Sequence, residues 1–295
     1  MTFCTAAPPV VAALGLALML TTAARADDAP AETPDKSGYT LLNPTPDDQL
    51  RSFNTDRPNK GTSPYTIDAG HFQYETDLFN YTYDRSSAGD VTTRSLVTAD
   101  PVLKLGLTND IEAELGVTGY AWTRSDDRMA GQRINHGEGF GDLVTKLKVN
   151  VLGNDGGTYA LALVPWVKLP TGAAGLGNNL VEGGLIVPLA INLPDDWTLS
   201  LQTEFDALKN ANDSGRHANF INLVSVSHAI VGNLSGAVEL YAQNGTDRFT
   251  PDIYTADAGL SYLITPTLQI DAGINVGFNR AAPDLNPYIG LSQRF

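Results

Sequence analysis

Apolar and polar residues alternate at every second position from residue 69 to the C-terminus. Between Leu268 and Phe278, one face holds Leu, Ile, Ala, Ile, Val and Phe, and the other holds Gln, Asp, Gly, Asn and Gly. Three earlier segments of similar length have the same period, and no window of that length has the apolar period of a helix. The pattern predicts β-strands whose two faces differ in chemistry.

Twelve such segments predict twelve strands, which begin near residues 70, 93, 111, 140, 158, 182, 198, 218, 234, 254, 268 and 287. The first strand changes phase near Leu78, which predicts a β-bulge. Short connections alternate with longer polar ones, of which the stretch from Thr123 to Gly139 is an example. Outer-membrane barrels have this layout, with tight periplasmic turns and long external loops. The sequence therefore predicts an all-β fold, a single antiparallel transmembrane β-barrel of about twelve strands over residues 69–295.

A soluble β-sandwich would alternate in the same way, so a soluble periplasmic or secreted binding protein is an alternative class. Two features favour the membrane. Aromatic residues such as Tyr120, Trp122 and Trp197 lie near strand ends, as in interfacial girdles. The chain also ends as an amphipathic strand, Tyr288 to Phe295, whose terminal Phe resembles the insertion signal of outer-membrane proteins. Both features predict localisation in the outer membrane of a Gram-negative bacterium.

The first 68 residues lack this alternation and divide into three segments. Residues 1–26 have the apolar run and the Ala24-Arg25-Ala26 site of a secretory signal peptide. Residues 27–50 are acidic and rich in Pro, which predicts a disordered leader. Residues 51–68 combine turn formers with aromatic and basic residues, which predicts an irregular segment that docks in the barrel mouth as a partial plug.

Composition excludes several kinds of function. The chain has 19 Lys and Arg against 33 Asp and Glu, with a formal net charge of −14, which argues against nucleic-acid binding. Its one cysteine, Cys4, lies in the signal segment, so the mature chain has no thiol chemistry. The four histidines are scattered without metal-ligand spacing. We expect no cofactor and no metal site.

Seven short stretches occur in a fixed order along the chain: Thr55-Asp-Arg-Pro58 with Ser63-Pro64, Gly70-His-Phe-Gln-Tyr-Glu75, Leu105-Gly-Leu-Thr-Asn-Asp-Ile-Glu112, Gly139-Phe-Gly-Asp142, Pro165-Trp-Val-Lys-Leu-Pro-Thr-Gly172, Leu263-Ile-Thr-Pro-Thr-Leu-Gln-Ile-Asp271 and Ala282-Pro-Asp284. This ordered set resembles the phenol-degradation meta-pathway, transporter-like family of Gram-negative outer membranes. The resemblance covers about residues 53–295. It implies an outer-membrane barrel and the passage of small organic compounds, aromatic ones among them, and it brings no catalytic residues.

If the Leu-rich faces contact lipid, the opposite faces line a lumen that holds more acids than bases. Arg57 precedes the first acid-rich strand, so we expect it to fold back from the periplasmic side and bind carboxylates in a bidentate pair. With Arg57, the candidate path residues are Glu75, Asp77, Glu112, Glu114, Asp142, Glu204, Asp206, Glu239, Asp257 and Asp271, together with Lys104, Lys146, Lys148 and Lys168.

The sequence thus predicts a monomeric, non-enzymatic channel for small solutes, inserted in the outer membrane by the barrel-assembly machinery. A structural barrel with a closed, salt-bridged lumen is one alternative, because small barrels fill their interior with polar side chains. A lipid hydrolase is another, with Ser225, Ser227 and His228 as the nearest approach to a nucleophile and base. These three residues lack the signature of the outer-membrane phospholipases.

Overall fold

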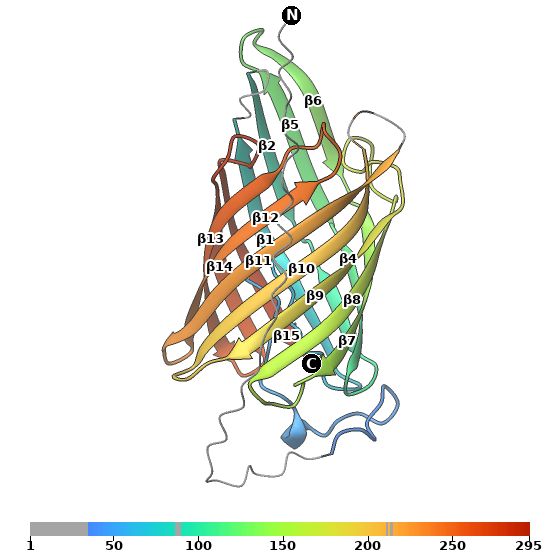
Figure 1. The fold of residues 1–295 in the computed structure, drawn as a ribbon, viewed down its shortest axis with the longest axis vertical. Helices are drawn as coiled ribbons and strands as arrows, with labels where there is room; N and C mark the ends of the chain where they lie inside the picture. Colours follow the sequence, from blue (N-terminus) through green and yellow to red (C-terminus); the bar gives the residue numbers. More distant parts are fainter. Residues whose placement is uncertain (1–34, 86–89, 211, 213–214) are drawn as a thin grey trace, which may run out of the picture. The chain divides into compact units, whose positions relative to one another are not determined.

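A single antiparallel sheet that closes on itself accounts for most of the chain (Figure 1). The computed structural model describes residues 35–295 except 86–89, 211 and 213–214. Contacts divide the chain into residues 1–33 and 34–295, and the sheet belongs to the second unit. The expected signal peptide, residues 1–26, and the first part of the expected leader therefore lie outside the described residues. No helix in the described ranges is long and apolar enough to cross a membrane.

The sheet contains fifteen strand segments, and a short 3-10 helix, η1 (Asp47–Gln49), precedes them. The segments are β1 (Phe72–Asp84), β2 (Val91–Thr98), β3 (Val102–Gly106), β4 (Ile111–Val117), β5 (Tyr120–Asp127), β6 (Gln132–Gly139), β7 (Leu143–Leu152), β8 (Tyr159–Leu169), β9 (Glu182–Asn192), β10 (Trp197–Lys209), β11 (Arg216–Val231), β12 (Leu234–Gly245), β13 (Ile253–Thr265), β14 (Leu268–Gly277) and β15 (Leu285–Arg294).

Three pairs of these segments are consecutive parts of one longer strand. β2 and β3 both pair with β1, β5 and β4 pair with β2 and β3, and β6 and β7 pair with β5 and β4. The sheet therefore has twelve strands, and the predicted fold class is confirmed. β15 closes it against β1, from Gln73 opposite Arg294 to Tyr83 opposite Leu285. The register shifts between Asp77 and Phe79, which confirms the predicted bulge.

The connections alternate as expected, with one correction. Five tight turns lie at the end where β15 finishes, and the other connections lie at the opposite end (Figure 1). The stretch from Thr123 to Gly139, expected to be a long loop, is instead mostly the β5–β6 hairpin. Its residues are polar on both faces, so apolar alternation does not mark them. A strand needs an apolar face only where it contacts lipid or a core, so the sheet continues beyond the alternating pattern.

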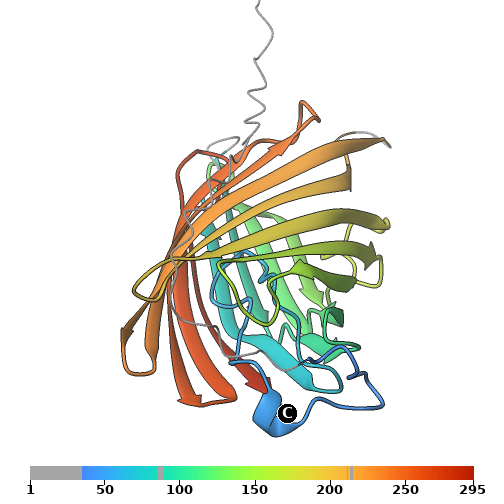
Figure 2. The same cartoon turned by 60° about the horizontal axis from the view of Figure 1, so that its bottom comes forward.

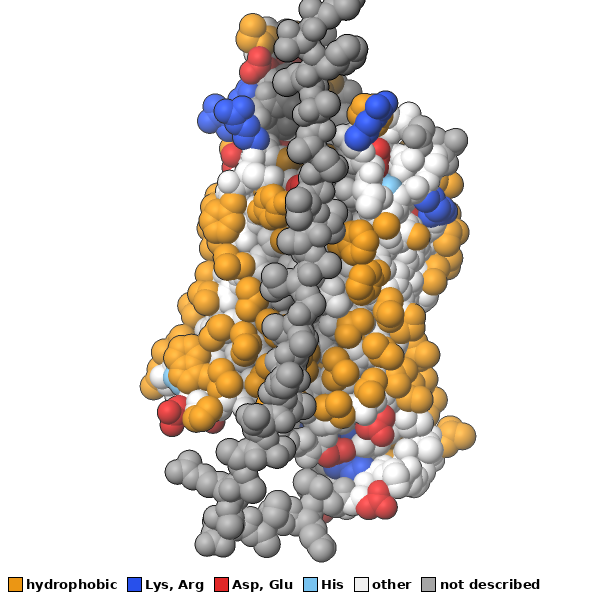
Figure 3. All heavy atoms as spheres, in the orientation of Figure 1, with side chains coloured by type: hydrophobic (Ala, Val, Ile, Leu, Met, Phe, Trp, Pro, Cys, Tyr) orange, Lys and Arg blue, Asp and Glu red, His pale blue; other side chains and the backbone are white. Residues whose placement is uncertain are grey.

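On the face shown in Figure 3, a broad hydrophobic band covers the middle of the barrel, and charged side chains lie toward the ends. Along the strands, exposed aliphatic residues such as Val238, Leu240 and Leu260 alternate with buried acids such as Glu239. The apolar face therefore points outward and the polar face inward, which is the reverse of a soluble β protein.

The expectation of a disordered leader over 27–50 is wrong for residues 35–50. Lys36 is 6% exposed and forms ion pairs with Asp68 and Asp155, at 3.2 and 3.1 Å. The backbone N–H groups of Leu41 and Thr45 donate to the carbonyls of Leu107 and Ala69. Composition predicts disorder from a shortage of apolar residues. This segment is held by ion pairs and backbone hydrogen bonds, which cannot be predicted from amino-acid composition.

Candidate functional site

Residues 51–68, called the plug here, lie inside the barrel (Figure 2). Polar side chains on strands β4, β10 and β12 of the barrel wall accept hydrogen bonds from backbone N–H groups of the plug. The N–H groups of Lys60, Thr62 and Ile67 donate to Glu239, Gln202 and Glu112, at 3.1, 2.7 and 2.6 Å. A buried backbone without such partners would be costly. The acidic face of the barrel therefore provides the hydrogen-bond acceptors that an irregular segment in the lumen needs.

Arg57 connects the plug to both sides of the β1–β15 closure. Its guanidinium donates to both carboxylate oxygens of Asp271 on β14, at 3.1 and 2.8 Å, and to Asp77 on β1, at 2.6 Å. Its backbone N–H donates to Glu75 at 3.2 Å. Burial alone would lower the pKa of Arg57, but Asp271 and Asp77 outweigh it and raise that pKa above its usual value. Arg57 thus remains a cation bound to two strands.

Glycine makes room for this contact. A Cβ at Gly290, on β15, would overlap the place where the Arg57 guanidinium packs. A Cβ at Gly259, on β13, would lie 2.7 Å from the ring of Pro58. The Arg57–Pro58 turn can therefore lie against the wall only because these two positions lack side chains.

Asp56 forms the second anchor, between two buried lysines. Lys104 on β3 lies 2.7 Å from Asp56 and 2.5 Å from Glu75, and Lys148 on β7 lies 3.7 Å from Asp56 and 3.1 Å from Glu112. Burial would raise the pKa of Asp56, yet Lys104 and Lys148 outweigh this and hold it below its usual value. The carboxylate therefore stays ionised and fixed between β3 and β7.

This lowered pKa has a consequence for pH dependence. A carboxyl group whose pKa is lower in the docked state stabilises docking above its ordinary pKa, near 3.9, and loses this contribution as the pH falls through the lowered value. We therefore expect Asp56 to keep the plug docked from pH 7 to pH 5 and to release it only as the pH falls through the lowered pKa, below the ordinary value. Single-channel conductance measured against pH tests this, with Asp56→Asn as the control that lacks the acid-dependent step. A conductance step above pH 5 that is absent in Asp56→Asn would contradict the assignment.

Lys60 anchors the far end of the plug. Its ammonium lies 2.9 Å from Asp257 and 2.5 Å from the Thr255 hydroxyl, and 4.5 Å from the centre of the Tyr241 ring. Asn59 donates to Ser225 at 3.3 Å. The plug therefore contacts β11, β12 and β13 as well as β1, β3, β7 and β14, and it crosses the lumen from wall to wall.

The wall of β10 keeps acids that no base neutralises. Within the described part of the chain, Glu204 and Asp206 have no ion pair with Lys or Arg, although both side chains are mostly buried. Asn219 on β11 donates to Asp206 at 2.9 Å, and Gln202 donates to Glu204 at 3.4 Å. This side of the lumen therefore holds two carboxyl groups that no neighbouring Lys or Arg neutralises.

A third cluster lies near the long-loop end. Lys168 on β8 lies 2.9 Å from Asp142 and 3.0 Å from Glu182, and the side chain of Asn178, from the β8–β9 loop, donates to Glu182 at 2.7 Å. Sequence reasoning missed Glu182, the first residue of β9, and Asn178, which lies in a loop without a periodic pattern.

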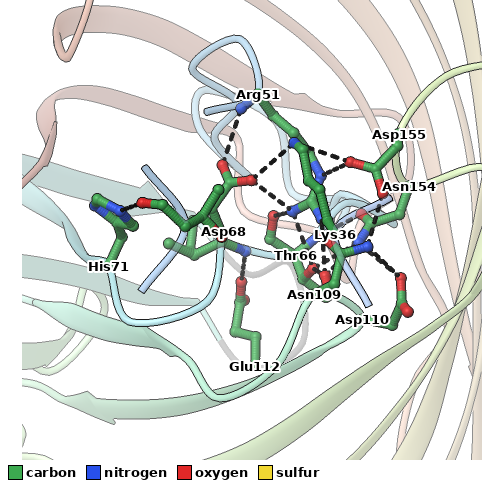
Figure 4. Close-up of polar contacts among 12 residues, drawn as sticks. Lys36, Arg51, Thr66, Asp68, His71, Asn109, Asp110, Glu112, Asn154 and Asp155 are labelled. Atoms are coloured by element: carbon green, nitrogen blue, oxygen red, sulfur yellow. Dashed lines mark hydrogen bonds and ion pairs between the residues drawn. The ribbon is translucent and has the colours of Figure 1, made fainter. Parts of the chain in front are cut away.

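A fourth cluster, at the tight-turn end, was also missed (Figure 4). Arg51 donates to Asp155 at 2.8 Å, and its backbone N–H donates to Asp68 at 3.0 Å. Asn109 donates to the other oxygen of Asp155 at 2.7 Å. Burial would raise the pKa of Asp155, but Asn109, Arg51 and Lys36 lower it. The leader, the plug and the turns after β3 and β7 are thus bound together. The sequence feature that could have predicted this cluster is the positive charge of Arg51 and Lys36 in an otherwise acidic part of the chain.

The candidate residues from the sequence therefore lie on the inner face in distinct groups. Arg57 lies with Glu75, Asp77 and Asp271; Glu112 and Glu114 lie with Lys146 and Lys148; Glu239 and Asp257 lie around Lys60; Glu204 and Asp206 lie on the β10 wall; and Asp142 and Lys168 lie near the long-loop end.

The arrangement does not assemble a hydrolase site from the candidate serines. Ser225 is buried against the plug residue Asn59. His228 instead stacks on Trp197, with ring centroids 4.3 Å apart. Because residues an odd number apart on a strand point to opposite faces, His228 does not face Ser225 or Ser227. Nor do the described residues contain a group of His, Cys, Asp and Glu that would hold a metal ion.

Known proteins share this architecture. The sequence model of a family described as "Putative MetA-pathway of phenol degradation" matches residues 55–295. The chain belongs to this family. The structure is similar to an outer-membrane channel from Pseudomonas putida F1, with a TM-score of 0.61 and 14% identity, over 82% of this chain and 100% of that one. It is also similar to the NanC porin, with a TM-score of 0.49 and 11% identity, over 75% and 98%. No match was found among curated proteins.

At 14% identity, the similarity to the Pseudomonas channel concerns the fold. The similarity in fold and the exposed hydrophobic residues on the outer face identify this protein as an outer-membrane β-barrel embedded in a lipid bilayer. The resemblance inferred from the sequence is confirmed.

Proposed function

We propose that this barrel is a narrow passive channel for small organic solutes, with the plug restricting its lumen. One observation carries the proposal: the closed, membrane-spanning sheet has a polar inner face on which two acids, Glu204 and Asp206, have no ion pair with a described Lys or Arg of the wall or the plug. The similar protein from Pseudomonas putida is itself described as a channel. The family description, which concerns phenol degradation, supports aromatic compounds among the solutes.

The lining favours cations over anions. Glu204 and Asp206 on the β10 wall have no ion pair in the described part of the chain, whereas Arg57, Lys104 and Lys148 are each bound to carboxylates. Uncompensated charge in a confined aqueous path concentrates counter-ions. We therefore place the cation path beside Glu204 and Asp206 on the β10 wall.

Removing this charge is expected to weaken cation selectivity. In planar bilayers under a KCl gradient, the wild type should show a cation-selective reversal potential. Glu204→Gln combined with Asp206→Asn should bring this potential toward zero, and the ratio of K⁺ to Cl⁻ permeability should fall by about twofold or more. Asp252→Asn, in an external loop, is the control and should leave the potential unchanged. Equal potentials in all three proteins would contradict the assigned path.

A structural barrel with a closed lumen is the second candidate, and the ion pairs that cross the lumen through Arg57 and Asp56 favour it. It predicts no solute-permeable current in any variant with a docked plug. Liposome swelling with phenol-sized sugars and alcohols separates the two, because a channel admits them and a closed barrel does not.

The proposal includes no enzymatic activity, since Ser225 and His228 lie on opposite faces of β11. It includes a monomer, supported by the closure of β15 on β1 within one chain, and insertion by the general barrel-assembly machinery.

A further inference from the structure

A row of basic residues crosses three neighbouring strands near the long-loop end. Arg94 on β2 is directly opposite Arg124 on β5, and Arg124 is opposite His136 on β6. Directly opposite residues of an antiparallel pair point to the same face. With Arg133, which is opposite Asp126 on β5, these residues are called the arginine row.

The arginine row lies on the outer face of the barrel. Arg94 is also opposite Tyr83 on β1, and its guanidinium lies 5.9 Å from the centre of that ring. Two positions before Tyr83, Tyr81 stacks with Phe79, which is 41% exposed and lies opposite the outward Ile289 of β15. Because alternate residues of a strand share a face, Tyr83 and Arg94 point outward as well.

An aromatic belt lies immediately on the membrane side of this row. One step along the strands, Tyr81, Leu96 and Trp122 are opposite one another on β1, β2 and β5. Tyr120 follows on the same face and is 42% exposed. Aromatic residues in such a belt lie at the level of the lipid headgroups. The arginine row therefore lies where headgroups end and water begins, at the external side that the long loops mark.

The charges of the row are only partly compensated. Asp126 receives Arg94 at 3.3 Å and Arg124 at 2.8 Å, and Glu138 lies 3.8 Å from His136. Two guanidinium groups directly opposite each other repel unless an anion lies between them. Arg94 and Arg124 are 42% and 40% exposed, and a guanidinium has five N–H donors, so both keep donors that point toward solvent and headgroups.

We propose that the arginine row is a binding site for the phosphate groups of a phosphorylated glycolipid in the outer leaflet. Paired guanidinium groups match phosphate oxygens in bidentate geometry, and the aromatic belt below them contacts the acyl region of the same lipid. This site goes beyond the proposed channel function, because it lies on the outer surface and not in the lumen.

Binding of lipid A tests the proposal. The full mature protein in detergent is titrated with fluorescent diphosphoryl lipid A, with dephosphorylated lipid A and with inorganic phosphate as competitor. The wild type should bind the diphosphoryl form, and Arg94→Ala combined with Arg124→Ala should weaken binding by about tenfold or more, since hydrogen bonds between charged groups are lost. Arg216→Ala combined with Arg248→Ala removes equal charge from the same end and should bind as the wild type does.

The outcomes distinguish binding of a phosphorylated lipid from binding of the acyl chains or of free phosphate. Stronger binding of the diphosphoryl form that is lost in the Arg94/Arg124 variant, and only weakly displaced by inorganic phosphate, supports a lipid site. Equal binding of both lipid forms, equal losses in the two double variants, or full displacement by inorganic phosphate at similar concentration overturns it. Heat-modifiable gel migration of each variant shows that the barrel is folded, so a loss of binding reports on the site.

Discussion

Replacing Arg57 by Ala is expected to raise single-channel conductance by about twofold or more, because conductance follows the open cross-section of the lumen. The change removes a side chain that binds β1 and β14 at the same time, through Asp77 and Asp271. It also leaves those two carboxylates unpaired in a confined space, where they repel each other and attract cations. Cation selectivity should therefore rise together with conductance.

Two further variants make the result specific. Arg57→Lys keeps the positive charge but cannot form the bidentate pair with Asp271, so its conductance should lie between those of the wild type and Arg57→Ala. Arg216→Ala, at the external end of β11, should conduct as the wild type does. If a correctly folded Arg57→Ala barrel conducts like the wild type, the plug does not restrict the path.

Period-two alternation was sufficient to predict a closed sheet and its number of strands. The reason is that a lipid-facing strand must expose an apolar side chain at every second position, so the membrane imposes the pattern on the sequence. Where lipid no longer imposes it, prediction failed. The β5–β6 hairpin extends past the aromatic residues at Tyr120 and Trp122, and its polar residues were interpreted as a loop.

For the site, the sequence indicates on which face of a strand a residue lies, but it does not indicate which residues contact one another. Alternation places Asp271 and Glu75 on the inner face, but nothing in the pattern pairs Asp271 with Arg57, which lies 214 residues away. Contacts of the plug depend on where an irregular segment turns, and turns without a period leave no repeating signal. Lys36 was missed for a related reason, because a segment held by ion pairs has the composition of a disordered one.

Replacing Lys148 by Met should destabilise the barrel by about 3–5 kcal/mol, which is the usual cost of leaving a buried ion pair with one partner. Lys148 is 1% exposed and lies 3.1 Å from Glu112, 3.3 Å from Glu114 and 3.7 Å from Asp56. Without its ammonium, these carboxylates lose their shared cation in a place that water hardly reaches. Urea unfolding in detergent, followed by the shift between folded and unfolded bands on gels, should show a lower midpoint.

The neighbouring lysine supplies the matched control. Lys146 is on the same strand and the same face and contacts Glu114 at 3.4 Å, but it is 21% exposed, so Lys146→Met should cost less than about 1 kcal/mol. Glu114 keeps Lys146 and Asp56 keeps Lys104, so Glu112 is the acid that Lys148→Met leaves without a cation. Adding Glu112→Gln to Lys148→Met removes that charge and should restore part of the stability. Equal midpoints for the two lysine variants would mean that water reaches Lys148 and its acids. The inner wall beside the plug would then be part of the open path, and the plug would fill less of the lumen than its contacts indicate.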